Sequence, residues 1–253
     1  MLREYVYLDR NRVEDFLSQL EGGVSENIRQ SETATGAGLE GGINVGVARI
    51  GASLTAPSIS RDELRRTTDV SLFNRLHLHL QRDDLRVVSD ADNLNWSLIK
   101  PGSLLELGCV VVVSGISKLS QTLSDMGAIA PVLGKSLDGM EGFGALFGGD
   151  VGVRYLLDDK IVAYSNLDPD SMRANLSELE GECTALVRIR KVLRTGKRTP
   201  LRSVAGMKLD VAKLEDLITR FDGAPAELGF KFVPDDLIAS GPSAIVTTVA
   251  IYR

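Results

Sequence analysis

The segment Leu104–Ser114 (LLELGCVVVVS) constrains the fold more than any other part of the sequence. It holds four consecutive valines, and β-branched residues favour extended strands. A continuous apolar run is typical of a strand that is buried on both faces. The apolar stretch ends at Ile116 and carries Glu106, so it is too short and too polar for a membrane helix of roughly 20 residues. We therefore expect an inner strand of a covered sheet and no transmembrane segment.

Helical and strand patterns alternate along the rest of the chain. Apolar residues at helical spacing predict helices, each given approximately, at 10–21, 61–81, 117–126, 169–179 and 211–221. Period-two or short apolar runs predict strands at 5–8, 151–156, 161–164, 185–193 and 244–252. The second and third of these strands form a predicted hairpin that turns at Asp158-Asp159. The fold class expected is α+β, with mixed or antiparallel sheets, packed helices and two subdomains.

Two glycine-rich stretches divide the chain. Residues 22–51 hold eight glycines, and the polar region at about 24–58 is predicted to be a mobile loop. Residues 134–152 hold seven glycines and predict a domain boundary. The expected organisation is an N-terminal α+β region, 1–148, and a C-terminal α+β domain, 149–253, with the order β-β-α-β-β-α-β.

Charge and cysteine content indicate a cytoplasmic protein that is not a dedicated nucleic-acid binder. The net charge is −5, whereas such binders are usually basic overall. Cys109 and Cys183 each lie in an apolar run, which predicts buried, reduced thiols, although a disulfide between them stays open. The N-terminal residues lack the apolar region of a secretory signal.

Nucleotide-binding motifs are matched only in part. Gly36–Gly41 fits G-x-G-x-x-G, but its flanks do not read as a strand before and a helix after. Gly134–Ser136 resembles the end of a P-loop, yet Ile129 stands where the first glycine belongs. Neither match predicts a phosphate site, and no cofactor is expected.

Catalytic and metal-binding patterns have no positive support. His77 and His79 are the only histidines, and no C-x-x-C or third histidine is available for a zinc site. We expect both at a surface or an interface, with a metal site as the alternative. Adjacent acidic pairs fall at turns or helix starts, where carboxylates are favoured by solvation and capping. The prediction is therefore no catalytic residue and no metal.

The segment from Cys183 to Leu209 departs from the acidic average of the chain. It carries eight basic residues and no acidic one. We predict a basic hairpin that binds an anion. The predicted ligand-binding residues are Arg188, Arg190, Arg194, Lys197, Arg198 and Arg202. The alternative is a solvated edge hairpin whose charges block strand pairing. Because the segment has no aromatic residue to stack on bases, single-stranded nucleic acid is disfavoured.

Both ends of the sequence resemble an uncharacterised bacterial family of unknown function. The resemblance rests on YVYLDRNRVEDFLSQLEGG at 5–23 and GPSAIVTTVAIYR at 241–253. It implies a bacterial cytoplasmic protein and brings no activity, cofactor or catalytic residue.

Three functions remain open after these observations. The leading hypothesis is a non-enzymatic binding or regulatory protein that engages an anionic small molecule or an acidic protein partner through the basic segment. The alternatives are an enzyme without a recognisable motif and a membrane-active effector that uses the glycine-rich segment Gly36–Ser58. The ligand and the oligomeric state do not follow from the sequence.

Overall fold

The computed structural model describes residues 3–21, 61–82, 85–92, 94–129, 149–202, 207, 209–221 and 233–253. They fall into two compact units: Arg10–Asp84, and Met1–Asp9 together with Leu85–Arg253. The predicted mobile loop at 24–58 and the partial motifs at 36–41 and 134–136 lie outside the described residues. Among the helices that are described, none combines the length and apolar character needed to cross a bilayer.

The smaller unit contains two helices, α1 (Arg10–Glu21) and α3 (Arg61–Arg82), and both confirm the predicted helices. The alternating run Leu76–Leu80 is helical, so His77 and His79 do not share a face as they would in a strand. His77 is buried, with 3% of its surface exposed, which corrects the expectation of a surface position. His79 contacts the Glu21 carboxylate, with 2.8 Å between Nε2 and Oε1.

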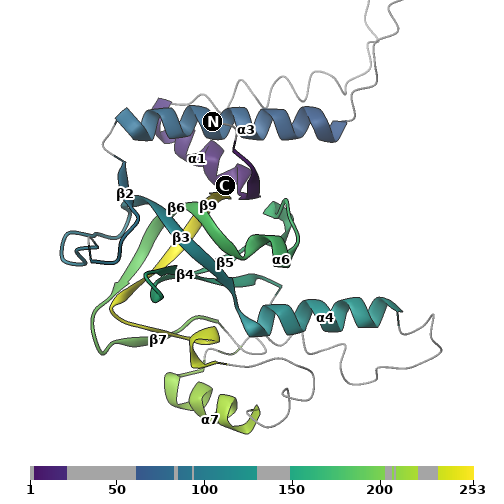
Figure 1. The fold of residues 1–253 in the computed structure, drawn as a ribbon, viewed down its shortest axis with the longest axis vertical. Coiled ribbons are helices and arrows are strands. Elements are labelled where there is room, and N and C mark those ends of the chain that lie inside the picture. The colour runs from purple at the N-terminus through teal and green to yellow at the C-terminus, as the bar shows by residue number, and fades with distance from the viewer. Residues whose placement is uncertain are drawn as a thin grey trace, which may run out of the picture. The chain divides into compact units, whose positions relative to one another are not determined.

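The larger unit is built on one sheet that closes on itself (Figure 1). Five strands form the ring: β3 (Leu104–Val113), β4 (Val151–Leu157), β5 (Lys160–Leu167), β9 (Ser243–Tyr252) and β6 (Gly181–Leu193). Neighbours in this order are antiparallel, except that β5 and β9 run parallel. The pairing of β6 with β3 closes the ring.

The strand order and directions are those of an OB-type barrel. Counted from β3, the ring follows the order 1-2-3-5-4-1, with the third and fifth strands parallel. In such barrels the ligand face lies on the second and third strands, between the loop joining strands 1 and 2 and the loop joining strands 4 and 5. The equivalent parts of this chain are β4 and β5, and the connections 114–150 and 194–242.

Two short strands extend the sheet beyond the ring. β1 (Tyr5–Leu8) pairs antiparallel with β9, and β2 (Arg86–Val88) pairs parallel with β3. The predicted α+β class with a mixed sheet is thus confirmed. The boundary expected near residue 148 does not separate two sheets, because β3 lies before it and pairs with β4 and β6 after it.

The remaining elements lie in the connections of the barrel. They are α4 (Gly115–Ile129), η1 (Pro169–Ser171), α6 (Leu176–Leu179), β7 (Arg198–Pro200), α7 (Val211–Phe221), η3 (Pro234–Asp236) and β8 (Ile238–Ser240). The order after residue 149 matches the prediction, with η3 and β8 added. The helix predicted at 169–179 is divided into η1 and the single turn of α6. The hairpin turn lies at Asp158-Asp159 as predicted, and both residues have positive φ.

The barrel interior is filled by aliphatic and tyrosine side chains, with Val111, Tyr155 and Ala185 fully buried. Cys109 and Cys183 face each other across β3 and β6 and are free, buried thiols. A hydrogen bond to Cys183, together with burial, raises the pKa of Cys109. A thiol in this state reacts poorly, because the thiolate is the nucleophile. The prediction of buried cysteines is therefore confirmed for both residues. The prediction of an inert thiol is supported for Cys109 alone, because the hydrogen bond with Cys109 lowers the pKa of Cys183.

Candidate anion-binding groove

A surface groove of about 570 Å³ lies beside the C-terminal end of β6. One wall comes from the β2–β3 loop, with Trp96, Ile99 and Pro101. The other wall comes from the end of β6 and the residue after it, with Arg190, Lys191 and Arg194. The groove thus joins an apolar, aromatic wall to a basic one.

The aromatic wall is held in place by β6 itself. The Gly102 N–H donates to the Ile189 carbonyl at 2.7 Å, and the Ile189 N–H donates to the Ser103 carbonyl at 2.9 Å. Gly102 has a φ of +92°, which glycine adopts without strain. The buried side chain of Ile99 anchors the loop in the core cluster, and Trp96 packs against that cluster. The two walls are therefore fixed to each other by backbone hydrogen bonds and by packing.

The basic wall depends on an irregularity in β6. The register between β6 and β9 shifts between Ile189 and Lys191, which marks a β-bulge. A bulge re-aims side chains that would otherwise alternate between the faces of the sheet. Arg190 and Lys191 are both exposed, whereas Ile189 points into the core. Two successive basic side chains consequently reach the surface at the groove.

The six predicted site residues differ in whether they line the groove and in what they contact. Arg190 and Arg194 line the groove, and neither forms an ion pair with any residue that the structure describes. Arg188 is exposed on β6 and Lys197 in the following turn, and neither belongs to the groove lining. Arg198 forms an ion pair with Glu215.

The alternative explanation, a charged edge, applies to part of the basic segment. β6 pairs with β9 as far as Leu193, but its pairing with β3 ends at Arg188, so Arg190 to Leu193 have a partner strand on the β9 side only. A turn does follow at 194–197, where the Lys197 N–H donates to the Arg194 carbonyl at 2.9 Å. The strand after the turn, β7, pairs with β8 rather than with β6. Edge protection therefore stays an alternative explanation for the charges of Arg190 and Lys191, whereas Arg188 lies between two partner strands.

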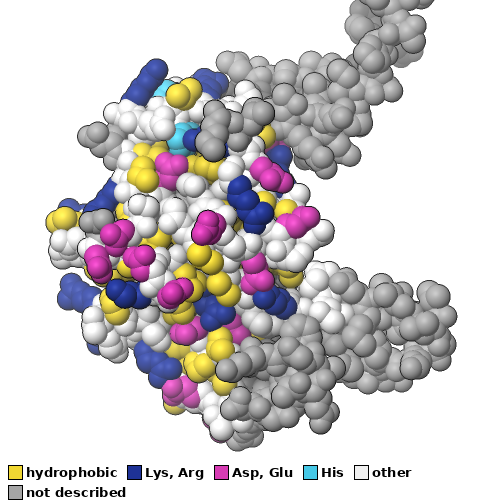
Figure 2. Space-filling model, in the orientation of Figure 1, with side chains coloured by type: hydrophobic (Ala, Val, Ile, Leu, Met, Phe, Trp, Pro, Cys, Tyr) yellow, Lys and Arg dark blue, Asp and Glu magenta, His cyan; other side chains and the backbone are white. Residues whose placement is uncertain are grey.

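The surface around the barrel carries both signs of charge (Figure 2). Lys and Arg side chains lie along the left side of the face shown, near the β2–β3 loop and β7, with acidic side chains interspersed. The cations of the groove are thus a local feature and not part of a uniformly basic face.

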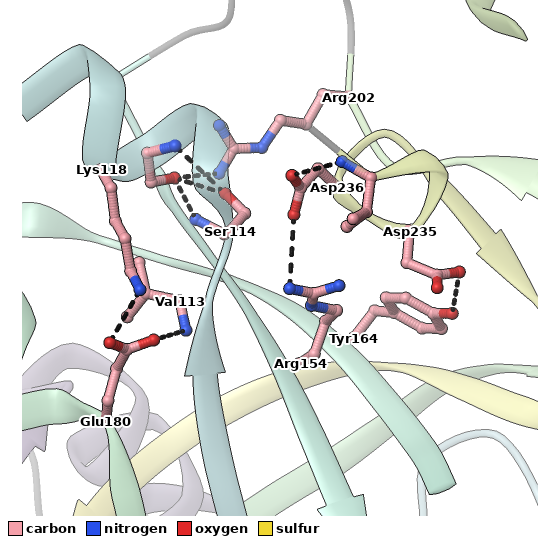
Figure 3. A network of polar contacts seen from close by, with 12 residues as sticks. Val113, Ser114, Lys118, Arg154, Tyr164, Glu180, Arg202, Asp235 and Asp236 are labelled. Atoms are coloured by element: carbon pink, nitrogen blue, oxygen red, sulfur yellow. Dashed lines mark hydrogen bonds and ion pairs between the residues drawn. The ribbon is translucent and has the colours of Figure 1, made fainter. Parts of the chain in front are cut away.

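Arg202 has a role distinct from that of the groove arginines (Figure 3). Its guanidinium donates from Nη2 to the Asp150 carbonyl at 2.8 Å and to Ser117 Oγ at 3.2 Å, and from Nε to Asn166 Oδ1 at 3.3 Å. Only 9% of its surface is exposed, and this burial lowers its pKa. Arg202 ties the two long connections of the barrel to β5 and is not available to a ligand.

The same face holds a second pair of polar contacts. Arg154 Nη2 lies 3.6 Å from Asp236 Oδ1, and the Tyr164 hydroxyl donates to Asp235 at 3.2 Å. Burial raises the pKa of Asp236 and raises that of Tyr164 to about 12. Arg154 comes from β4 and Tyr164 from β5, the strands that carry the ligand in an OB-type barrel. In this chain Arg202, Asp235 and Asp236, from the connection 194–242, contact these two strands.

Sequence reasoning missed Trp96 as a site residue and placed Lys191 in the basic run without assigning it a role. Trp96 lies far from the basic segment in sequence, and the pairing of β3 with β6 brings the two together. Trp96 is the only tryptophan of the chain, which marks it as a candidate binding residue. The sequence does not indicate, however, that it lies beside the basic segment. Among the described residues no group of three or more His, Cys, Asp or Glu side chains could hold a metal ion.

Comparison with known proteins gives a family and no activity. No curated protein and no solved structure matches the chain. The family model of a domain of unknown function, DUF6414, matches residues 2–252, which is nearly the whole chain. The predicted resemblance to a family of unknown function is thereby confirmed, and the chain belongs to the DUF6414 family.

Proposed function

We propose that this protein is a non-enzymatic binding or regulatory protein that holds an anionic ligand or partner in the groove of Arg190, Lys191 and Arg194. The observation that carries the proposal is the grouping of these three cations, none of which is ion-paired to a described residue. Arg198, on the same basic segment, instead has an acidic partner in Glu215. A bound anion would supply the charge that the groove lacks.

The chemistry of the lining favours binding over catalysis. Arginine offers a planar set of donors that matches phosphate or carboxylate oxygens. The groove volume of about 570 Å³ lies within the usual range of small-molecule sites. Its lining residues include no carboxylate, histidine or thiol that would act as a base or nucleophile. We place this activity in the bacterial cytoplasm, and the two facing but unbonded thiols agree with a reducing compartment.

The test is a charge reversal in the groove with a matched control. The probe is inorganic tripolyphosphate, measured by calorimetry at low and moderate salt. Arg190→Glu with Arg194→Glu is expected to weaken binding by about tenfold or more, because both contact cations become repulsive. The control, Arg188→Glu with Lys197→Glu, changes the net charge equally outside the groove and should retain most of the affinity. Equal losses in both variants, or no binding by the native protein, would overturn the proposal.

A further inference from the structure

We propose that the groove accepts a nucleotide unit, with the base stacked on Trp96 and the phosphates held by Arg190, Lys191 and Arg194. This inference rests on the proposed function and names the class of anion. The unit can come from a free nucleotide or from a single-stranded nucleic acid, which share a base, a sugar and phosphates.

Trp96 is positioned as a stacking surface. Its ring packs against the barrel core on one side and also lines the groove. The surrounding turn is fixed by the Leu98 N–H donating to the Asn95 carbonyl at 3.1 Å and by Ser97 Oγ donating to Asn95 Oδ1 at 2.7 Å. A pre-positioned indole loses little conformational freedom when a planar ligand stacks on it. Any base can stack, because every base presents a π face.

The cations line the same groove as this ring and follow one another along the strand. Arg190, Lys191 and Arg194 follow the end of β6 and the first residue of the turn. A basic track beside an aromatic residue is the combination that binds single strands without strong sequence preference. The sequence disfavoured such ligands because the basic segment contains no aromatic residue. The fold supplies the aromatic residue from the β2–β3 loop.

The shape of the site and the charge of the protein argue against two other anionic partners. Leu98 is 66% exposed in the same turn, so an anionic membrane is the strongest competitor. However, Trp96 lines a concave groove, which a flat bilayer surface does not fill. The net charge of −5 disfavours duplex nucleic acid, which carries a high density of negative charge.

The single tryptophan makes the test direct, because fluorescence excited at a wavelength that tyrosine does not absorb reports on Trp96 alone. ATP, a short oligothymidylate, inorganic tripolyphosphate and phosphatidylglycerol vesicles are each titrated into the native protein. We expect quenching with ATP or the oligonucleotide and little change with tripolyphosphate. ATP binding without the oligonucleotide identifies a free nucleotide, and the reverse identifies a nucleic acid strand.

Variants separate stacking from charge, with affinities measured by calorimetry. Trp96→Leu should lower the affinity for the base-containing ligand by about tenfold and leave the affinity for tripolyphosphate unchanged. Trp96→Phe should restore part of the affinity, since it keeps a ring, and a thermal melt checks that both variants fold. Base-containing ligands that bind no tighter than tripolyphosphate, or quenching by vesicles alone, would overturn this inference while leaving anion binding intact. Absence of binding by all four probes would overturn the proposed function as well.

Discussion

Arg202 and the groove arginines belong to one basic stretch of sequence but lie in opposite surroundings. Arg202 is buried and donates to a carbonyl, a hydroxyl and an amide oxygen. Arg190 and Arg194 line an open groove and have no ion-pair partner among the described residues. The comparison teaches that a run of basic residues can hold structural and binding cations together. The structural cation is the one that has acceptor oxygens of the protein within hydrogen-bond distance.

The largest expected difference is in stability. Arg202→Met removes the three hydrogen bonds that the buried guanidinium donates to Asp150, Ser117 and Asn166. We expect the free energy of unfolding to fall by about 3 kcal/mol, measured by urea denaturation. Arg194→Met is the matched control and should change it by no more than about 0.5 kcal/mol. Similar losses in both variants would remove the distinction.

A smaller loss is expected where the backbone approaches Arg202. A Cβ at Gly152 would lie 2.5 Å from Arg202 Nη2 and 3.0 Å from Ser114 Oγ. Gly152→Ala should displace the guanidinium and lower the free energy of unfolding by about 1–2 kcal/mol. In an Arg202→Met background the same change should cost less, and a double-mutant cycle measures this coupling. If the two substitutions lower the free energy of unfolding additively, the destabilisation by Gly152→Ala does not act through Arg202.

Substitutions in the groove should lower the affinity for an anion without lowering the stability of the protein. Arg190→Met with Arg194→Met should leave the free energy of unfolding within about 0.5 kcal/mol of the native value, because both side chains are exposed. The affinity for tripolyphosphate should fall, and its dependence on salt should become shallower, since fewer cations contact the anion. Arg188→Met with Lys197→Met is the control for salt dependence. An unchanged salt dependence in the groove variant would count against a direct contact.

The smallest effect concerns pH. Burial raises the pKa of Asp236 above its ordinary value of 3.8, so the native state holds this proton more tightly than the unfolded chain. The contribution of Asp236 to the free energy of unfolding is therefore greatest below that value and falls as the pH rises through the raised pKa. Asp236→Asn should remove this component of the pH dependence, measured by urea denaturation at a series of acidic pH values. An unchanged profile would mean that Asp236 is solvated as in the unfolded chain.

Much of the fold follows from sequence patterns, because periodicity reports local structure. The helix stripe after Asp9, the valine run of β3 and the final strand β9 were each predicted and are confirmed. The partners of the strands were not predictable. Apolar runs indicate that β5 and β9 are strands, but not that they lie parallel to each other. The same limit applies to the boundary predicted near residue 148, which the pairing of β3 with β4 and β6 crosses.

The candidate site was predictable only on its basic side. Arg190 and Arg194 stand out as charges in an acidic chain. The contribution of Trp96 depends on the register that places the β2–β3 loop beside Ile189, and this register is a long-range property. The burial of Arg202 was equally hidden, since its acceptors come from three separate parts of the chain.

The position of β9 in the ring has a consequence for synthesis of the protein. β9 follows the other strands of the ring along the chain, yet it pairs with β1, β5 and β6. Until β9 has been synthesised, β5 and β6 each present an open edge, and such edges promote association with other chains. The barrel therefore closes only when β9 has joined the four ring strands that precede it, and those strands are exposed to aggregation until then.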